Sequence, residues 1–208
     1  IVETGENEVM LSLKILAHAP LERVEIRNGS EVCSIHRPFD ASDLGYRIRV
    51  IWSGAEYRGR GRQTSWKGRA DFRHCRILKM KKINAWNHEK RLQTCGTKSV
   101  EWDAVTTGNF GGFDVWLEEG DDAELDLASN HGSLRIPLNQ IDLEDHVLDA
   151  GGLERQIRVF RLPEINPHRE IEHHLQIPLK PNQDNPVCVT TEDAVSYTHL
   201  TLPTSGGG

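Results

Sequence analysis

The chain has 208 residues, of which 37% are hydrophobic and 27% charged, and its formal net charge is -6. This length allows one large domain or two small ones. Every apolar run is far too short to span a bilayer, so the composition excludes a helical membrane protein and indicates a globular protein without a membrane partner.

Alternation of apolar and polar residues with a period of two predicts β-strands along most of the chain. In the first part, strands are expected near residues 9–16, 23–27, 31–35 and 47–52. Asn28-Gly29 favours a type I′ turn, because both residues tolerate a positive φ. The best helical candidate is the short segment 40–44, and a second lies near 142–146.

The same alternation continues in the second part of the chain. Strands are expected near residues 113–117, 123–128, 134–138, 156–160 and 171–177, and a further one near 187–193. Leu125 and Leu127 are expected to pair with Leu134 and Ile136 around a turn at residues 130–132. Half-buried strands separated by turn signals favour an all-β fold of packed antiparallel sheets.

The expected architecture is an immunoglobulin-like antiparallel sandwich with a second β domain inserted into it. Residues 1–63 and 163–194 would form the discontinuous sandwich, and residues 64–162 the inserted domain. Insertion is tolerated where entry and exit lie side by side on a surface loop. The alternative is one continuous sandwich or barrel of unusual size.

The charges are distributed unevenly. Residues 58–82 contain ten Lys or Arg and one acid, Asp71, whereas residues 101–154 contain fourteen Asp or Glu and one base, Arg135. Such a pair of segments favours faces that complement each other within the protein and disfavours a nucleic-acid partner.

Two loops are candidates for an interaction surface. The first, residues 57–62 (YRGRGR), has arginines that could bind phosphate or stack on aromatic rings, although a tight loop facing the acidic segment is the favoured interpretation. The second, residues 106–114 (TTGNFGGFD), is either a sharp turn or a loop shaped for a small ligand. The candidate interaction residues are Tyr57, Arg58, Arg60, Arg62, Trp66, Asn109 and Phe110.

The histidines and cysteines predict no catalytic residue, metal site or cofactor in this chain. His173 and His174 are adjacent on a strand and point to opposite faces, so they cannot converge on one ion with His168. The four cysteines lie far apart, without a Cys-x-x-Cys spacing. This distribution favours buried thiols in a reducing, cytoplasmic compartment.

Several segments together resemble the C-terminal region of an uncharacterised bacterial family. They are residues 21–29 (LERVEIRNG), 52–62 (WSGAEYRGRGR), 106–114 (TTGNFGGFD), 151–153 (GGL) and 161–163 (RLP). Members of that family carry an upstream metal-dependent phosphoesterase-like domain of the polymerase and histidinol phosphatase (PHP) type.

This resemblance implies that the chain is a non-catalytic accessory β module of a metal-dependent hydrolase. Its partner would be the catalytic domain of the same protein, which would hold any divalent metal upstream of Ile1. The alternative is an independent module that binds a glycan or another ligand. That module would use exposed tryptophans as stacking surfaces: Trp66, Trp86, Trp102 and Trp116.

The two ends of the chain carry expectations of their own. A start at Ile1 is typical of a piece of a longer protein. Residues 195–204 (VSYTHLTLPT) resemble a translated sequencing adapter, so residues 195–208 are expected to be a non-native tail. Truncation after Asp193 is then expected to change stability by less than about 1 kcal/mol.

Overall fold

The computed structural model describes residues 7–59, 62–85, 91–118, 120, 122–181, 183–193 and 197–201. The chain divides into two compact units: unit 1 comprises Ile1–Asp40 and Ile165–Gly208, and unit 2 comprises Ala41–Glu164. The described residues contain no α-helix, only two short 3-10 turns, Ala41–Asp43 and Leu138–Gln140. All strand pairs are antiparallel, which confirms the all-β prediction.

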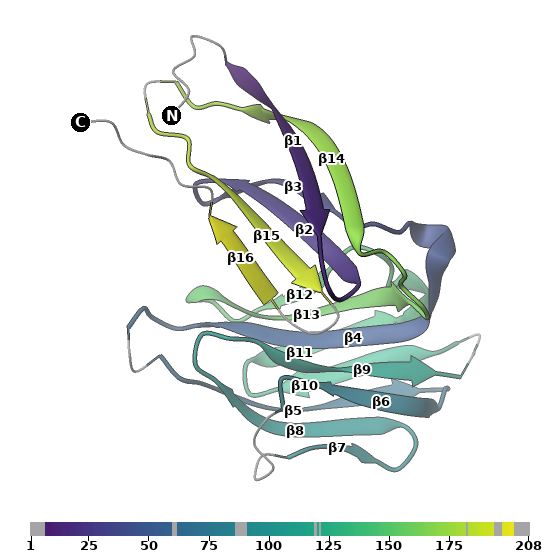
Figure 1. Cartoon of the computed structure of the whole chain (residues 1–208). Helices are drawn as coiled ribbons and strands as arrows, with labels where there is room; N and C mark the ends of the chain where they lie inside the picture. The colour runs from purple at the N-terminus through teal and green to yellow at the C-terminus, as the bar shows by residue number, and fades with distance from the viewer. Residues whose placement is uncertain are drawn as a thin grey trace. The chain divides into compact units, whose positions relative to one another are not determined.

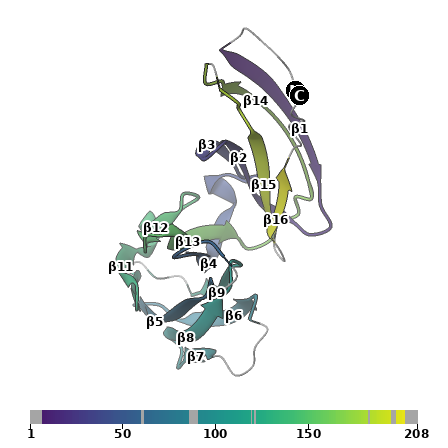
Figure 2. The ribbon, with the colours of Figure 1, turned by 90° about the vertical axis from the view of Figure 1, so that its left-hand side faces the viewer.

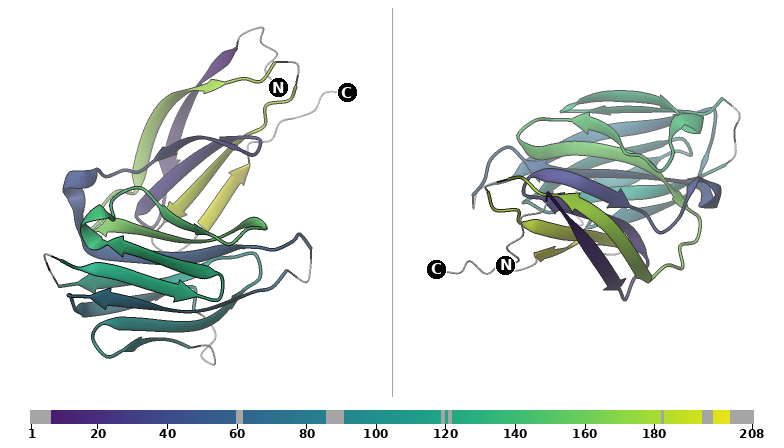
Figure 3. Two further views of the ribbon diagram at one scale, coloured as in Figure 1. Left: turned by 180° about the vertical axis from the view of Figure 1, so that it is seen from behind. Right: turned by 90° about the horizontal axis from the view of Figure 1, so that it is seen from above.

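Unit 1 contains a two-stranded sheet, β1-β14, and a four-stranded sheet in the order β16-β15-β2-β3. β1 and β14 run side by side along their whole length (Figures 1 and 3). The bounds are β1 Glu8–Leu16, β2 Leu21–Asn28, β3 Glu31–His36, β14 Glu170–Pro178, β15 Val187–Asp193 and β16 Tyr197–Thr201.

Unit 2 contains two five-stranded sheets, in the orders β11-β10-β5-β8-β7 and β12-β13-β4-β9-β6. Their strands are labelled in Figures 1 and 2. The bounds are β4 Leu44–Ala55, β5 Thr64–Arg73, β6 Ile77–Ile83, β7 Leu92–Cys95, β8 Ser99–Thr106, β9 Gly111–Leu117, β10 Glu124–Ser129, β11 Gly132–Pro137, β12 His146–Asp149 and β13 Leu153–Pro163.

The hairpins that the sequence predicted have the expected partners. In the β10–β11 hairpin, Leu125 lies opposite Ile136 and Leu127 opposite Leu134. The first hairpin closes with Asn28 opposite Glu31, and Gly29 has a φ of 62°. The alternating apolar residues put one face of each strand in the core, which fixes the register.

Several elements differ from the prediction. Five strands of unit 2 had not been predicted: β5, β6, β7, β8 and β12. Residues 142–146 are not helical, and β12 already begins at His146. The helical candidate at 40–44 is a single 3-10 turn, Ala41–Asp43.

The division between the units also differs from the expected one. Residues 41–63 had been assigned to the discontinuous domain together with residues 1–40. In the structure β4 pairs with β13 on one side and β9 on the other, so it is a central strand of unit 2. The immunoglobulin-like topology stays a prediction.

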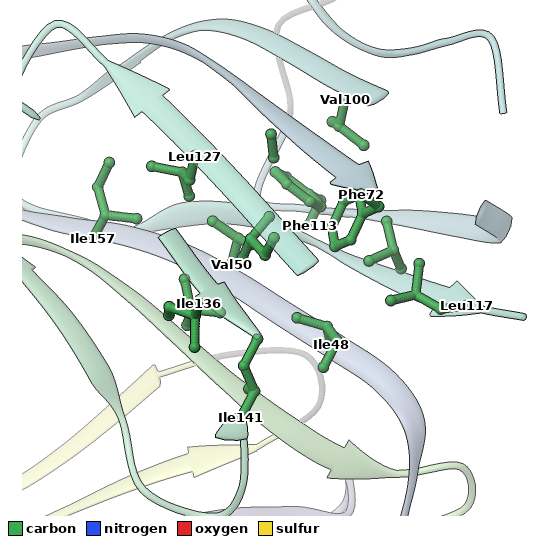
Figure 4. Close-up of a cluster of buried hydrophobic side chains, with 14 of the residues drawn as sticks. Ile48, Val50, Phe72, Val100, Phe113, Leu117, Leu127, Ile136, Ile141 and Ile157 are labelled. Atoms are coloured by element: carbon green, nitrogen blue, oxygen red, sulfur yellow. The ribbon is translucent and has the colours of Figure 1, made fainter. Parts of the chain in front are cut away.

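The core of unit 2 is built from both of its sheets. Figure 4 shows Val50, Phe72 and Phe113 among the side chains of this cluster. Phe113 is fully buried, and its ring lies 5.9 Å from that of Trp102 and 6.3 Å from that of Trp52, measured between centroids. Such tilted aromatic pairs add to the stabilisation from area burial alone.

Unit 1 has a smaller core. Its buried residues are Leu21, Val24, Ile26, Ile171, Ile177 and Val189. At one edge of the four-stranded sheet, β16 pairs with β15 over residues 188–192. The non-native origin of residues 195–208 stays a prediction, and the truncation after Asp193 tests it directly.

Gly54 lies where two backbones come close together. Its φ is +85°, and a Cβ built on it would lie 2.0 Å from the carbonyl oxygen of Glu154. Glu154 belongs to an irregular part of β13 and has a positive φ of 51°. Only glycine fits both the dihedral and the space at this position.

We expect Gly54→Ala to destabilise unit 2 by about 2–3 kcal/mol, because left-handed strain and overpacking add. Gly96→Ala is the matched control, since Gly96 has a φ of +68° but nothing within 4 Å of its Cβ position. It should show the dihedral strain alone, about 1–2 kcal/mol. Urea denaturation measures both, and equal losses would refute the steric argument.

Candidate functional site

Three loops of unit 2 meet at one end of its sheets. They are the β4–β5 loop (described at residues 56–59 and 62–63), the β8–β9 loop (107–110) and the β12–β13 loop (150–152). The strand pairing requires this, because Thr64 lies opposite Thr106, Trp52 opposite Gly111, and Leu153 opposite Ala55. We call these three loops the loop end. Loops held by a rigid sheet are common binding surfaces.

The first two loops contact each other directly. Arg62 Nε donates a hydrogen bond to the carbonyl of Thr107 over 3.2 Å. The Arg62 guanidinium lies against Gly108, where a Cβ would be 2.2 Å from Nε and where φ is +94°. Glycine at position 108 therefore allows Arg62 to cross the neighbouring loop.

The β8–β9 loop is also fixed by amide side chains. Asn109 Oδ1 accepts a hydrogen bond from the Thr107 N–H at 3.0 Å. Asn84, at the end of β6 with a φ of 50°, donates from Nδ2 to the carbonyl of Phe110 at 3.2 Å. These bonds restrict the loop without using the exposed side chains of the β4–β5 loop.

The β12–β13 loop is held by Arg155. Its guanidinium donates two hydrogen bonds to the carbonyl of Ala150, at 2.8 and 2.6 Å, and lies 3.5 Å from a carboxylate oxygen of Glu56. Arg155 thus connects this loop to the β4–β5 loop. Sequence reasoning missed both Asn84 and Arg155, because neither belongs to a recognisable motif.

The structure brings most of the predicted interaction residues to the loop end. Tyr57 is 54% exposed, and Arg58, Arg62 and Asn109 are exposed as well. Phe110 is half-buried. Arg60 lies outside the described residues.

Trp66 was wrongly included in the interaction surface. It is fully buried in the core of unit 2, and its Nε1 donates a hydrogen bond to Thr106 Oγ1 at 2.9 Å. On β5, Trp66 has the same parity as Ala70 and Phe72, which are also fully buried. Alternation therefore places Trp66 on the core-facing side of its strand.

The other tryptophans give little support to a stacking surface. Trp102 is only 2% exposed and stacks on Trp52. Trp116 is half-buried, and the cations of Arg47 and Lys79 lie 5.1 and 4.5 Å from its ring centroid. Trp86 lies outside the described residues.

Four cations of the basic segment, Lys67, Arg69, Arg73 and Arg76, form ion pairs within unit 2. Arg69 Nη1 lies 2.6 Å from Glu101, Arg73 Nη2 lies 2.6 Å from Asp126, and Arg69 also bonds to Asp71. Hydrogen bonds to Asp71 and Glu101 raise the pKa of Arg69. Lys67 and Arg76 form longer ion pairs with Asp103 and Glu118.

The cations of the loop end differ from the paired ones. Within the described part of the chain, neither Arg58 nor Arg62 forms an ion pair with a carboxylate. The side chain of Arg62 instead donates to a backbone carbonyl. The loop end therefore keeps positive charge that the acidic segment does not compensate.

The histidines and cysteines are placed as follows. His173 points inward, whereas His174 is exposed and its Nδ1 lies 2.9 Å from Ser12 Oγ. Among the described side chains, no group of three or more His, Cys, Asp or Glu is arranged to hold a metal ion. None of the four cysteines, all within the described residues, forms a disulfide.

Comparison with known proteins adds no identification. No family model, no curated protein and no solved structure matches the chain. In the residues that the structure describes, no helix has the length and apolar character needed to cross a membrane.

Proposed function

We propose that this chain is a non-catalytic accessory β module of a PHP-type metal-dependent hydrolase, and that the loop end of unit 2 docks on the catalytic domain. The module's role would be to support or gate that domain, which would hold the divalent metal. The resemblance described above supplies the identity of the partner.

One observation supports the loop end as the docking surface. The loop end is ordered by its own hydrogen bonds and displays Tyr57, Arg58 and Arg62, whereas Lys67, Arg69, Arg73 and Arg76 are in ion pairs with acidic side chains of unit 2. Tyrosine and arginine are the residues most enriched at binding hot spots. A pre-ordered loop also loses less conformational entropy on binding. The expected partner surface is acidic.

Docking can be tested with the catalytic domain produced separately and titrated with this chain in a calorimeter. We expect Arg58→Ala with Arg62→Ala to weaken binding by about tenfold or more, since such residues contribute over 1.4 kcal/mol at an interface centre. The matched control is Lys67→Ala with Arg69→Ala, which removes two paired cations from the same unit and should leave the affinity unchanged.

Two outcomes would contradict this proposal. Equal weakening by the control pair would show that net charge alone matters. Sub-micromolar binding of the chain to DNA or RNA near physiological salt would indicate a nucleic-acid site instead, particularly if it were lost on changing Arg58, Arg60 and Arg62 to Ala. That binding would also fall steeply with salt, because counterions are released from the phosphates.

A further inference from the structure

Two histidines of unit 1 stack on each other across its two sheets. His36 is the last residue of β3, in the four-stranded sheet, and His173 lies in β14, in the two-stranded sheet. Their ring centroids are 4.4 Å apart and the planes differ by 19°. The contact joins strands that are separated by more than one hundred residues in the chain.

The pair lies next to the apolar core of this unit. His173 is opposite Leu13 in the β1–β14 register, and His36 is opposite Val24 in the β2–β3 register. Val24 is fully buried and Leu13 packs against the same cluster. His173 Nε2 is buried without a hydrogen-bond partner. A charge on this ring would therefore be poorly solvated.

The charged side chains of the surrounding strands lie on other faces or make other contacts. On β1 and β14, Lys14 pairs with Glu170 and Glu172 on the exposed face, one residue out of phase with His173. On β2, Arg23, Glu25 and Arg27 alternate with the inward Val24 and Ile26, whereas Glu22 has the same parity as these two residues and is 1% exposed. After β3, Arg37 donates a hydrogen bond to the carbonyl of Glu22.

On β15, the carboxylate of Glu192 lies 3.5 Å from the guanidinium of Arg23. Cys33 of β3 packs against the core.

Besides burial, His173 is the ionisable neighbour that shifts the pKa of His36. Burial, followed by the proximity of His173, lowers the pKa of His36 below its ordinary value. No carboxylate is among these causes, so the environment favours the neutral ring.

We propose that the His36–His173 stack is a proton-sensitive latch that holds β3 against β14 when the ring of His36 is neutral and releases these strands when His36 becomes protonated. An imidazolium at position 36 would carry its charge next to an apolar core and against the face of a stacked ring. The chemical signal is the proton itself, in the range where histidine titrates.

The direction of the pH effect follows from linkage. Because His36 has a lowered pKa in the folded state, the unfolded or opened state binds a proton first as the pH falls. The latch is fully effective above the ordinary histidine pKa of about 6.5 and weakens as the pH falls from there through the lower folded-state pKa.

Hydrogen exchange of the full chain tests the latch. After correction for the intrinsic pH dependence of exchange, protection of the β3 and β14 amides should fall about tenfold for each unit by which the folded-state pKa is lowered, between about pH 7.5 and 5.5. His36→Phe keeps an aromatic ring but cannot be protonated, so its protection should not depend on pH. His174→Gln, on the opposite face of β14, should behave like the unmodified chain.

A second measurement keeps the test decisive if a variant fails to fold. Proton NMR of the unmodified chain follows the ring of His36 directly, and it should titrate below about 6.5. A His36 that titrates at or above this value would overturn the proposal. An identical loss of protection in His36→Phe and the unmodified chain would do the same.

Discussion

Phe113→Ala is expected to destabilise unit 2 by about 3–5 kcal/mol, the usual cost of truncating a buried aromatic ring to alanine. The ring is fully buried on β9 and lies against Trp52 and Trp102. Its removal loses both the transfer free energy and the contacts of the surrounding atoms, because a close-packed core collapses only partly around a cavity.

Tryptophan fluorescence during urea denaturation reports on unit 2 alone, because all five tryptophans lie between Ala41 and Glu164. Phe113→Leu, which preserves most of the volume, should cost less than about 1.5 kcal/mol. Tyr57→Ala is the exposed control and should leave the midpoint unchanged. A small effect of Phe113→Ala would mean that this core is not close-packed.

Asp114→Asn is expected to destabilise the protein by about 3–5 kcal/mol, the cost of removing one partner from a buried ionic group. The Asp114 side chain is fully buried and lies 2.6 Å from both Arg47 Nη2 and Arg49 Nε. The amide cannot compensate two guanidinium charges. Thermal or urea denaturation of the two proteins at neutral pH measures the loss.

The pH dependence of stability separates the effect of the Asp114 charge from the effect of side-chain packing at this position. Burial by itself would raise the pKa of Asp114, but Arg49 and Arg47 outweigh it and the pKa lies below the ordinary value. The stabilisation by this carboxylate is therefore fully present above the unfolded pKa of about 3.9 and is lost as the pH falls through the lower folded value. The difference between wild type and Asp114→Asn should shrink in the same range.

Asp126 provides a matched control. It also contacts two arginines, Arg73 and Arg135, each at 2.6 Å, but its side chain is 23% exposed. Asp126→Asn should cost less than about 1 kcal/mol, because exposed ion pairs are screened by solvent. Equal costs at positions 114 and 126 would show that burial does not govern the strength of these interactions.

The sequence alone determined the local part of this fold. Alternation located β1, β10, β11 and β14, because a half-buried strand must repeat its apolar residues every second position. The same periodicity placed His173 inward and His174 outward, as observed. The sequence also predicted that Tyr57, Arg58, Arg62 and Asn109 lie in loops, since glycine-rich turns between strands expose their side chains.

Only the tertiary structure decided which segments meet. β5 has an apolar face interrupted by Gly68 and an exposed face full of charges, and its strand character depends on pairing with β8 and β10, which lie elsewhere in the chain. β4 belongs to unit 2 because it pairs with β9 and β13. The alternation of residues within a strand does not show which other strands it pairs with.

The candidate sites show the same limit. Arg62 bonds to the carbonyl of Thr107, and the ring of His36 stacks on that of His173. Both pairs are far apart in the sequence, so no local motif predicts either contact. Trp66 follows the arginine-containing loop in the sequence, but its place on β5 puts it in the core of unit 2. Periodicity specifies which face of a strand is apolar, whereas the packing of distant strands decides what that face covers.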